Sequence, residues 1–291
     1  MTKKLLGVAF FFMMMKAQAQ LNPLGTQYFL NQYLGNPALA GNAPGYEVFG
    51  VVKGQWSAIE GAPVMQAVTL TRGSENKKVG LGLYFYNESA GVIKRTSLKA
   101  SYAYHLPINQ GANYIDFGLS AGYMNEWIDF NRVKGDNTDG SLANFNQRKM
   151  YFDGDFGIAY RSNRLTIQGA LPNLKRLMDR DVIRSVADRS LYLTAVSYKF
   201  FFDDQTTELE PKVIYRGVQN YKDIVDLGAN LRFVNGKLTF NGIYHSTNSV
   251  TVGAGTTYKD ALTILCQYTT NTADLQGYSN GEVEIGLKFH F

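Results

Sequence analysis

The sequence has no long apolar run, although 45% of its 291 residues are hydrophobic. No stretch of about eighteen apolar residues occurs, which excludes a transmembrane helix. A single cysteine, Cys266, excludes an intramolecular disulfide; with Leu262 and Ile264 it falls on one apolar strand face and is interpreted as a small hydrophobe. Only 7 prolines are present, whereas Tyr (19) and Gly (29) are abundant. This composition favours a chain built mostly of strands.

The numbers of basic and acidic residues are nearly equal. The chain has 29 basic and 24 acidic residues, a formal charge of +5. Lys3, Lys4 and Lys16 belong to the leader described next, and without them 26 basic residues face 24 acidic ones. Such a balance gives no support to nucleic-acid binding, so we expect no nucleic-acid partner.

Residues 1–19 have the three parts of a secretory signal peptide in order. Lys3 and Lys4 provide the positive start, Leu5 to Met15 form an apolar region, and Ala17-Gln18-Ala19 is a small-x-small cleavage site. We therefore predict a signal peptide at 1–19 and a mature chain that begins at Gln20.

From about residue 47 onward, apolar residues alternate with small or polar ones. A period of two places the two sets on opposite faces of a strand. Each segment is about ten residues long, the length that a tilted strand needs to cross a bilayer. The apolar face would meet lipid, and the polar face would line a lumen. In the last segment, Val283, Ile285, Leu287, Phe289 and Phe291 alternate with Glu282, Glu284, Gly286, Lys288 and His290.

The alternation predicts an all-β fold, a transmembrane antiparallel β-barrel of about 14 strands at 47–291. The first, second and eighth segments alternate poorly, so thirteen or sixteen strands stay open. Every second connection between successive segments is a short turn. The long loops, at about 125–150, 171–189 and 270–279, belong to the other set of connections and therefore lie at the other end, as in outer-membrane barrels. A soluble β-sandwich would share the period but not the leader or this asymmetry. The predicted segments are 47–56, 63–72, 77–87, 95–106, 112–124, 151–161, 163–170, 190–201, 207–217, 222–234, 237–245, 249–258, 260–269 and 280–291.

Residues 20–46 do not alternate. Asn36-Pro37 and several glycines punctuate this stretch, which indicates a short turn or helix followed by a loop. It is too apolar and aromatic for a free linker. We therefore expect a plug-like N-terminal segment that packs in or under the barrel.

The sequence resembles the PorP/SprF family, outer-membrane proteins of the type IX secretion system found in Bacteroidota. Order and spacing agree along the whole chain, although Lys53-Gly54 stands where members often have an arginine. That departure weakens any role for a basic side chain there. The resemblance is carried by Gln27-Tyr28, Asn36-Pro37-Ala38-Leu39-Ala40-Gly41, Gln55-Trp56 followed by Gly61-Ala62-Pro63, and the closing Glu284-Ile285-Gly286-Leu287-Lys288-Phe289.

The resemblance implies a non-enzymatic, multi-pass barrel of the outer membrane that serves protein secretion and gliding motility. The implied partners are a secreted adhesin-like cargo with a C-terminal sorting domain, a periplasmic ring, a peptidoglycan-binding protein and the lipid bilayer. It leaves open whether the chain is a core component or dedicated to one cargo. We expect long loops to meet the cargo, and short turns or the mature N-terminus to meet periplasmic components. The implied structural or partner residues are Gln27, Tyr28, Asn36, Pro37, Ala38, Gly41, Gln55 and Trp56.

Within that set, Asn36, Pro37 and Gly41 are expected to hold the N-terminal segment, because Pro37 restricts φ and Gly41 permits close backbone approach. Gln55 and Trp56 are expected to lie beside it.

No motif predicts a catalytic, cofactor or metal site. His105, His245 and His290 are scattered over polar strand faces and are interpreted as hydrogen-bonded lumen residues. Ser120 and Ser197 have neither a nucleophile elbow nor a recognisable His–Asp pair. Asp136 to Gly140 resembles a calcium loop but lacks its spacing, which favours an ordinary turn.

Two alternatives stay open. Residues 174–189 have helical spacing of charged and apolar residues, and they would either cover the barrel mouth or form a partner surface. For the whole chain, the second function hypothesis is an outer-membrane transporter or channel for a hydrophobic or small solute. A fourteen-stranded barrel is wide enough for such a passage, although mixed lumen charges such as Asp155 and Lys99 favour stabilising pairs over a conducting path.

Overall fold

The computed structural model describes residues 26–56, 61–129, 150–175, 190–202, 206–218, 223–270 and 280–291. The predicted signal peptide, the Asp136–Gly140 turn and nearly all of the predicted 174–189 helix lie outside these residues.

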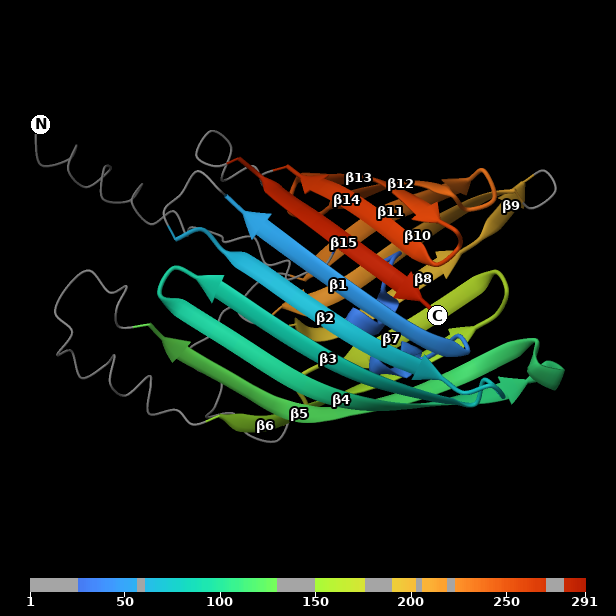
Figure 1. Cartoon of the computed structure of the whole chain (residues 1–291), viewed down its shortest axis with the longest axis horizontal. Coiled ribbons are helices and arrows are strands. Elements are labelled where there is room, and N and C mark those ends of the chain that lie inside the picture. The colour runs from blue at the N-terminus through green and yellow to red at the C-terminus, as the bar shows by residue number, and fades with distance from the viewer. Residues whose placement is uncertain are drawn as a thin grey trace, which may run out of the picture.

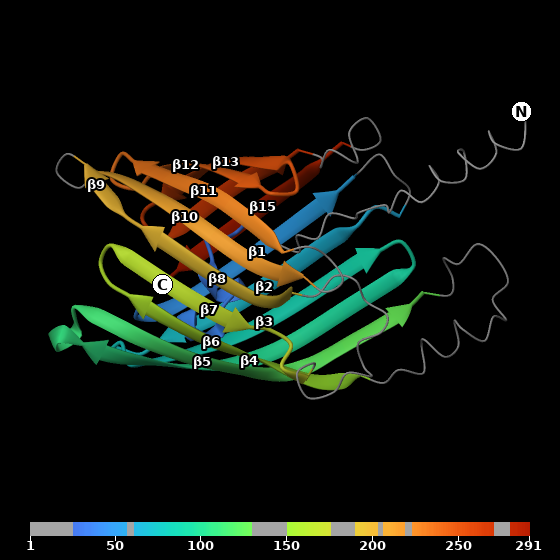
Figure 2. The same cartoon turned by 180° about the vertical axis from the view of Figure 1, so that it is seen from behind.

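Antiparallel strands follow one another around a closed sheet (Figures 1 and 2). The sheet closes where the first strand pairs with the last, Val51 standing opposite Gly286. The strands are β1 (Gly45–Gln55), β2 (Val64–Gly73), β3 (Val79–Ala90), β4 (Ile93–Ile108), β5 (Asn113–Ile128), β6 (Tyr151–Arg161), β7 (Leu165–Leu171), β8 (Ser190–Tyr198), β9 (Phe200–Phe202), β10 (Thr207–Val218), β11 (Ile224–Phe233), β12 (Leu238–His245), β13 (Ser249–Tyr258), β14 (Leu262–Thr269) and β15 (Glu282–His290).

β8 and β9 together form one crossing of the barrel wall. Both pair with β10, β8 from Lys212 onward and β9 up to Leu209. The interruption lies beside Pro211, which has no N–H to donate to the ladder. The barrel therefore has 14 strands in the sense of wall crossings, which confirms the predicted fold and strand number.

The two faces of the wall have the inverted polarity of a membrane barrel. Along β2, exposed and buried residues alternate without interruption. Outward-facing residues are apolar: Leu119 of β5 is 58% exposed, whereas its lumen-facing neighbour Ser120 is 7% exposed. Cys266 is exposed on the outer face, as its apolar neighbours predicted. An apolar outer surface of this kind is the one that faces lipid in membrane barrels.

Aromatic pairs lie near both ends of the strands. Tyr46 at the start of β1 stacks on Phe291 with ring centroids 5.7 Å apart. Near the opposite end, Tyr123 and Phe152 meet edge to face at 5.7 Å. Such belts place amphipathic rings at the two membrane interfaces. Among the described residues, no helix is long and apolar enough to cross a membrane.

The two ends of the barrel differ in their connections. At one end, called here the short-turn end, hairpins close over a few residues, for example through η3 (Asn109–Gly111) between β4 and β5. At the other, the long-loop end, 22 residues separate Ile128 from Tyr151 and 18 separate Leu171 from Ser190. The C-terminal end of the chain lies at the short-turn end (Figure 1).

Candidate functional site: the lumen and its N-terminal segment

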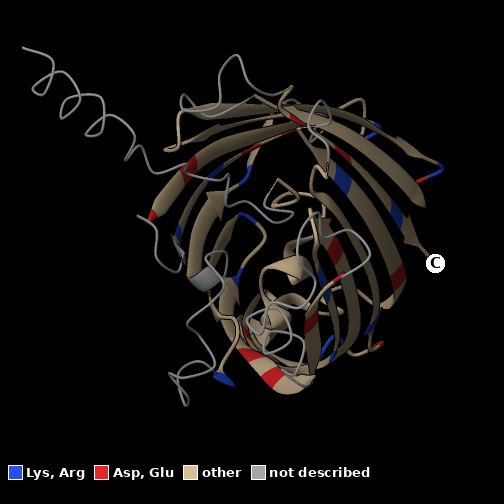
Figure 3. Cartoon of the chain, turned by 90° about the vertical axis from the view of Figure 1, so that its left-hand side faces the viewer, with Lys and Arg blue, Asp and Glu red and all other residues tan. Residues whose placement is uncertain are grey.

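The chain from Thr26 to Gly41, called here the lumen segment, lies inside the barrel (Figure 3). It contains two 3₁₀ turns, η1 (Gln32–Leu34) and η2 (Pro37–Leu39). Each begins with an asparagine cap: the Asn31 side chain accepts from Tyr33 N at 3.1 Å, and Asn36 accepts from Ala38 N at 3.0 Å. Asparagine side chains satisfy the free amides at the start of a turn, and proline is favoured just after them.

The lumen segment runs from the long-loop end towards the short-turn end. Its first residue, Thr26, donates to the Glu284 carboxylate close to the long-loop end of β15, and Gln27 Nε2 donates to Gln267 Oε1 at 2.8 Å. Its last residue, Gly41, packs against the β2 and β3 backbones near the short-turn end, where β1 begins. The described chain therefore starts far from the short turns, at the end opposite to the one we expected to meet periplasmic components.

Two wall glycines leave the space that η2 occupies. A Cβ atom added to Gly118 would lie 2.2 Å from Ala38 N, and one added to Gly157 would lie 1.9 Å from Asn36 Oδ1. Asn36 itself is fully buried, and its Nδ2 donates to Ile158 O and Gln168 Oε1, each at 3.2 Å. The turn is thus held by close backbone approach as well as by hydrogen bonds.

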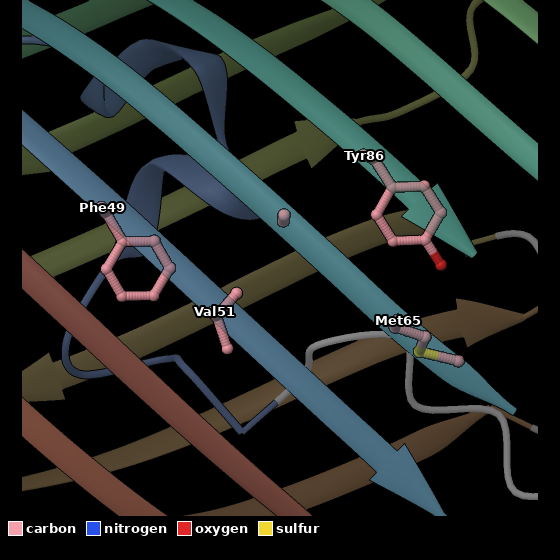
Figure 4. Packing of buried hydrophobic residues seen from close by; sticks show 5 residues of the cluster. Phe49, Val51, Met65 and Tyr86 are labelled. Carbon is pink, nitrogen blue, oxygen red and sulfur yellow. The ribbon is translucent and has the colours of Figure 1, made fainter. Parts of the chain in front are cut away.

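An apolar cluster lies between the lumen segment and the first three strands. It is formed by Phe49 and Val51 of β1, Met65 and Ala67 of β2 and Tyr86 of β3 (Figure 4). Leu30 and Leu34 of the segment pack against this cluster. Burial of these side chains contributes roughly 1.5–3 kcal/mol for each one fully removed from water.

Two lysines of other strands donate to backbone carbonyls of the segment. Lys212 Nζ donates to Tyr28 O at 2.8 Å and lies 4.8 Å from the Phe29 ring centroid. Lys288 Nζ donates to Leu30 O at 3.1 Å. Lys212 is on β10 and Lys288 on β15, so the middle of the segment contacts β10 on one side and the cluster of β1 to β3 on the other.

Two buried His–Asp–Arg groups hold the two ends of the segment. At the short-turn end, Asp116 lies 2.7 Å from His105 Nδ1 and accepts from Arg161 Nε at 2.5 Å, while His105 Nε2 lies 3.1 Å from Ala40 O.

Near the long-loop end, Asp226 lies 2.7 Å from His245 Nδ1 and accepts from Arg216 Nε at 3.0 Å and from the Tyr28 hydroxyl at 2.8 Å. Both aspartates are fully buried. The interpretation of His105 and His245 as hydrogen-bonded lumen residues is confirmed.

The structure contains two His–Asp pairs that were not recognised in the sequence. His105 and Asp116 are direct cross-strand partners in one hairpin, as are Asp226 and His245 in another. Pairing outward from each short turn would have found both, because register fixes which residues face each other.

The second group has the order of a hydrolytic site, since Thr251 Oγ1 lies 2.8 Å from His245 Nε2. Thr251 is, however, fully buried, and neither it nor His245 lines the lumen cavity described below. Without access for a substrate, this arrangement is structural. No group of three or more His, Cys, Asp or Glu side chains among the described residues could hold a metal ion.

Gln55 and Trp56 lie away from η2, at the opposite end of β1. Gln55 Nε2 donates to Glu282 Oε1 at 2.7 Å, and Glu282 also pairs with Lys53 at 2.5 Å. Trp56 has a φ of 50° and donates its backbone N–H to Gly281 O at 2.9 Å. These two residues therefore connect β1 to β15 at the long-loop end, and no hydrogen bond between them and the lumen segment is seen in the described residues.

A cavity of about 220 Å³ lies between the lumen segment and the wall formed by β3 to β10. Tyr33, Pro37 and Gln168 line its inner end, and Arg95 and Asn173 line it near the long-loop ends of the strands. Lys99 and Asp155 form an ion pair in its wall at 2.7 Å. Asp155 Oδ1 also accepts from Asn173 N at 2.9 Å, so the chain that leaves β7 is tied to the cavity wall.

Burial changes the acidity of the segment tyrosines. It raises the pKa of Tyr33 to about 12, although a hydrogen bond with Ser101 acts in the opposite direction. It also raises the pKa of Tyr28, and the Arg216 charge partly offsets this. Both phenols are therefore neutral hydrogen-bonding groups at physiological pH.

Comparison with protein families identifies the chain. The family model described as "Type IX secretion system membrane protein PorP/SprF" matches residues 17–289. The chain belongs to the PorP/SprF family. The resemblance seen in the sequence is thus confirmed, and with it the location in the outer membrane. None of the curated proteins compared with the chain matches it.

Solved structures similar to this PorP/SprF barrel include a channel and a transporter. The CymD monoaromatic hydrocarbon channel aligns with a TM-score of 0.54 at 12% identity, covering 92% of this chain and 94% of CymD. The Ralstonia pickettii toluene transporter TbuX aligns with a TM-score of 0.52 at 13% identity, covering 89% and 92%. At such low identity the likeness concerns the fold alone.

Proposed function

We propose that this PorP/SprF barrel is a non-enzymatic partner of type IX secretion that binds an adhesin-like cargo and helps to export it or hold it at the cell surface. The observation that carries the proposal is the filled lumen. The lumen segment contacts strands on all sides of the barrel, from Thr69 on β2 through Ser101 on β4 to Lys212 on β10. A barrel occupied in this way favours recognition over passage.

Membership of the family supports a role in the type IX secretion system. The two ends of the barrel differ in structure and could bind different partners. The long-loop end would receive the C-terminal sorting domain of the cargo. The short turns would meet the periplasmic ring or a peptidoglycan-binding component. Exposed cations at the short turns, among them Lys77, Lys237 and Lys259, suit acidic surfaces there.

A second candidate function is transport of a hydrophobic or small solute. The cavity of about 220 Å³ beside the segment is the observation in its favour. A conducting or transporting state would require the segment to move, against the buried contacts of Asn36 and Ala40.

The test is purification of the tagged full chain from its native membrane in mild detergent, followed by mass spectrometry. Recovery of one large surface protein would support cargo binding, and ring components would support a core role. Gln55→Ala, which removes the hydrogen bond to Glu282, gives a variant altered at the long-loop end, and Lys237→Ala is its counterpart at the short turns. Selective loss of cargo with the first variant would support the assignment of ends. A lone barrel, with solute uptake that depends on it, would contradict the proposal and favour the transporter.

A further inference from the structure

The lumen cavity is lined mainly by aromatic and aliphatic side chains. Tyr28, Tyr33, Tyr84 and Tyr86 contribute rings to it, and Leu34, Met124 and Leu193 contribute aliphatic or thioether surface. Aromatic and aliphatic walls with a few polar groups are the usual lining of a small-ligand pocket. A cavity of about 150 Å³ is enough for one benzene ring, so the volume of about 220 Å³ here accommodates a ring with a substituent.

The cations of this cavity are already neutralised. Lys99 pairs with Asp155 at 2.7 Å, Arg216 with Asp226 at 3.0 Å, and Lys212 with Glu210 at 3.3 Å. Arg95 pairs with Glu88 at 2.7 Å. With each charge matched, the cavity offers no net attraction for an anion, and a neutral group avoids the cost of desolvating a further charge.

Two hydroxyl groups of the wall are available to a ligand. Ser97 Oγ is buried without a hydrogen bond, although Ser97 lines the cavity and is 2% exposed. Tyr84 also lines the cavity, and no hydrogen bond between its hydroxyl and another described residue is seen. Lys99 stands opposite Tyr84 in the β3–β4 register and Ser97 lies two residues from Lys99, so the two hydroxyl groups serve the same patch. A buried polar group without a partner is costly, and a bound ligand can satisfy it.

From these observations we infer that the lumen cavity is a binding site for a neutral, phenol-sized group that is inserted from the long-loop end. The ring lies among the tyrosines and aliphatic side chains, and its hydroxyl bonds to Ser97 and Tyr84. The group is carried either by a free monoaromatic molecule or by a tyrosine side chain of a surface partner. The site goes beyond the proposed function, because a small probe can fill it whether or not a cargo exists.

The experiment uses the purified full chain in detergent and p-cresol, the side-chain analogue of tyrosine, with binding measured by saturation-transfer NMR. Ala195→Phe fills the cavity from β8, whereas Thr194→Phe places the same ring on the outer face of that strand and is the matched control. We expect Ala195→Phe to weaken binding at least tenfold and Thr194→Phe to leave it within about twofold. If Ala195→Phe does not fold, Ala170→Leu fills the same cavity from β7.

A second pair of measurements tests the hydroxyl contact. Tyr84→Phe should weaken p-cresol binding by about two- to tenfold, the value of one hydrogen bond, and leave toluene binding unchanged. Absence of p-cresol binding to the native chain, or equal binding by the Ala195 and Thr194 variants, would overturn the inference.

The source of the group follows from pull-downs with the same two variants. Loss of a surface partner with Ala195→Phe but not Thr194→Phe assigns the group to that partner. Retention of the partner together with loss of p-cresol binding assigns a free molecule. Failure of the native chain to bring down any partner would count against the proposed function and not against this site.

Discussion

The Nδ1 atom of His105 lies 2.7 Å from Oδ1 of Asp116, and neither residue is exposed to solvent. The other ring nitrogen of His105 lies 3.1 Å from the carbonyl oxygen of Ala40, and Arg161 donates a hydrogen bond to the Asp116 carboxylate. One hairpin thus holds the end of the lumen segment through a histidine whose orientation an aspartate sets.

Asp116→Asn should release this end of the segment. The substitution leaves Arg161 without its buried counter-charge and removes the carboxylate beside His105, and removing one partner of a buried pair costs about 3–5 kcal/mol. We expect a lower thermal midpoint in detergent and faster hydrogen–deuterium exchange in residues 36–41. Glu75→Gln, which removes a charge from an exposed turn, is the control. Unchanged exchange in 36–41 would show that the group does not hold the segment.

Gly118→Val should displace η2 and open the lumen. A Cβ at this position would lie 2.2 Å from Ala38 N, so the segment or the wall has to move, at a cost of about 1–3 kcal/mol. We expect little ion conductance from the native chain in planar bilayers and frequent openings from the variant. Gly50→Val, on β1 where an added Cβ meets nothing within 4 Å, should behave as the native chain does. Equal conductance of all three chains would argue against a plugging role.

Tyr33→Phe should change the response of the barrel to alkali. Burial raises the pKa of Tyr33 from 10.0 to about 12, so the folded state prefers the neutral phenol. The stability that this preference contributes, about 3 kcal/mol, is fully present below pH 10 and is lost as the pH rises through about 12. The thermal midpoint of the native chain should fall over this range, and that of Tyr33→Phe should fall less. A parallel decline in both chains would contradict the burial argument.

Single cysteines should report which end of the barrel faces the cell surface. Cys266 lies on the outer wall, so Cys266→Ser provides the background. Ser246→Cys marks the long-loop end, and Lys237→Cys marks the short-turn end; both native residues are exposed. In intact cells, a membrane-impermeant maleimide should label the first and not the second. The opposite pattern would invert the orientation and move the cargo surface to the short turns.

The barrel could be predicted from the order of the amino acids. The period of two depends only on neighbouring residues, because successive side chains of a strand point to opposite faces. Strand positions such as β13 (Ser249–Tyr258), the short turns and the side that carries long loops could therefore be predicted without any tertiary contact. Local register would also have found the His105–Asp116 pair.

The way in which the lumen is filled depends on contacts between residues far apart in the sequence. Thr26 meets Glu284 across 258 positions of sequence, and Asn36 meets Gln168 across 132. The motif residues that were expected to lie together are therefore far apart. Asn36 and Pro37 lie at η2, whereas Gln55 and Trp56 lie at the far end of β1. Such contacts follow from barrel closure and from the direction in which the segment threads the lumen. No local period encodes either, because both depend on strands that come together only when the sheet is complete.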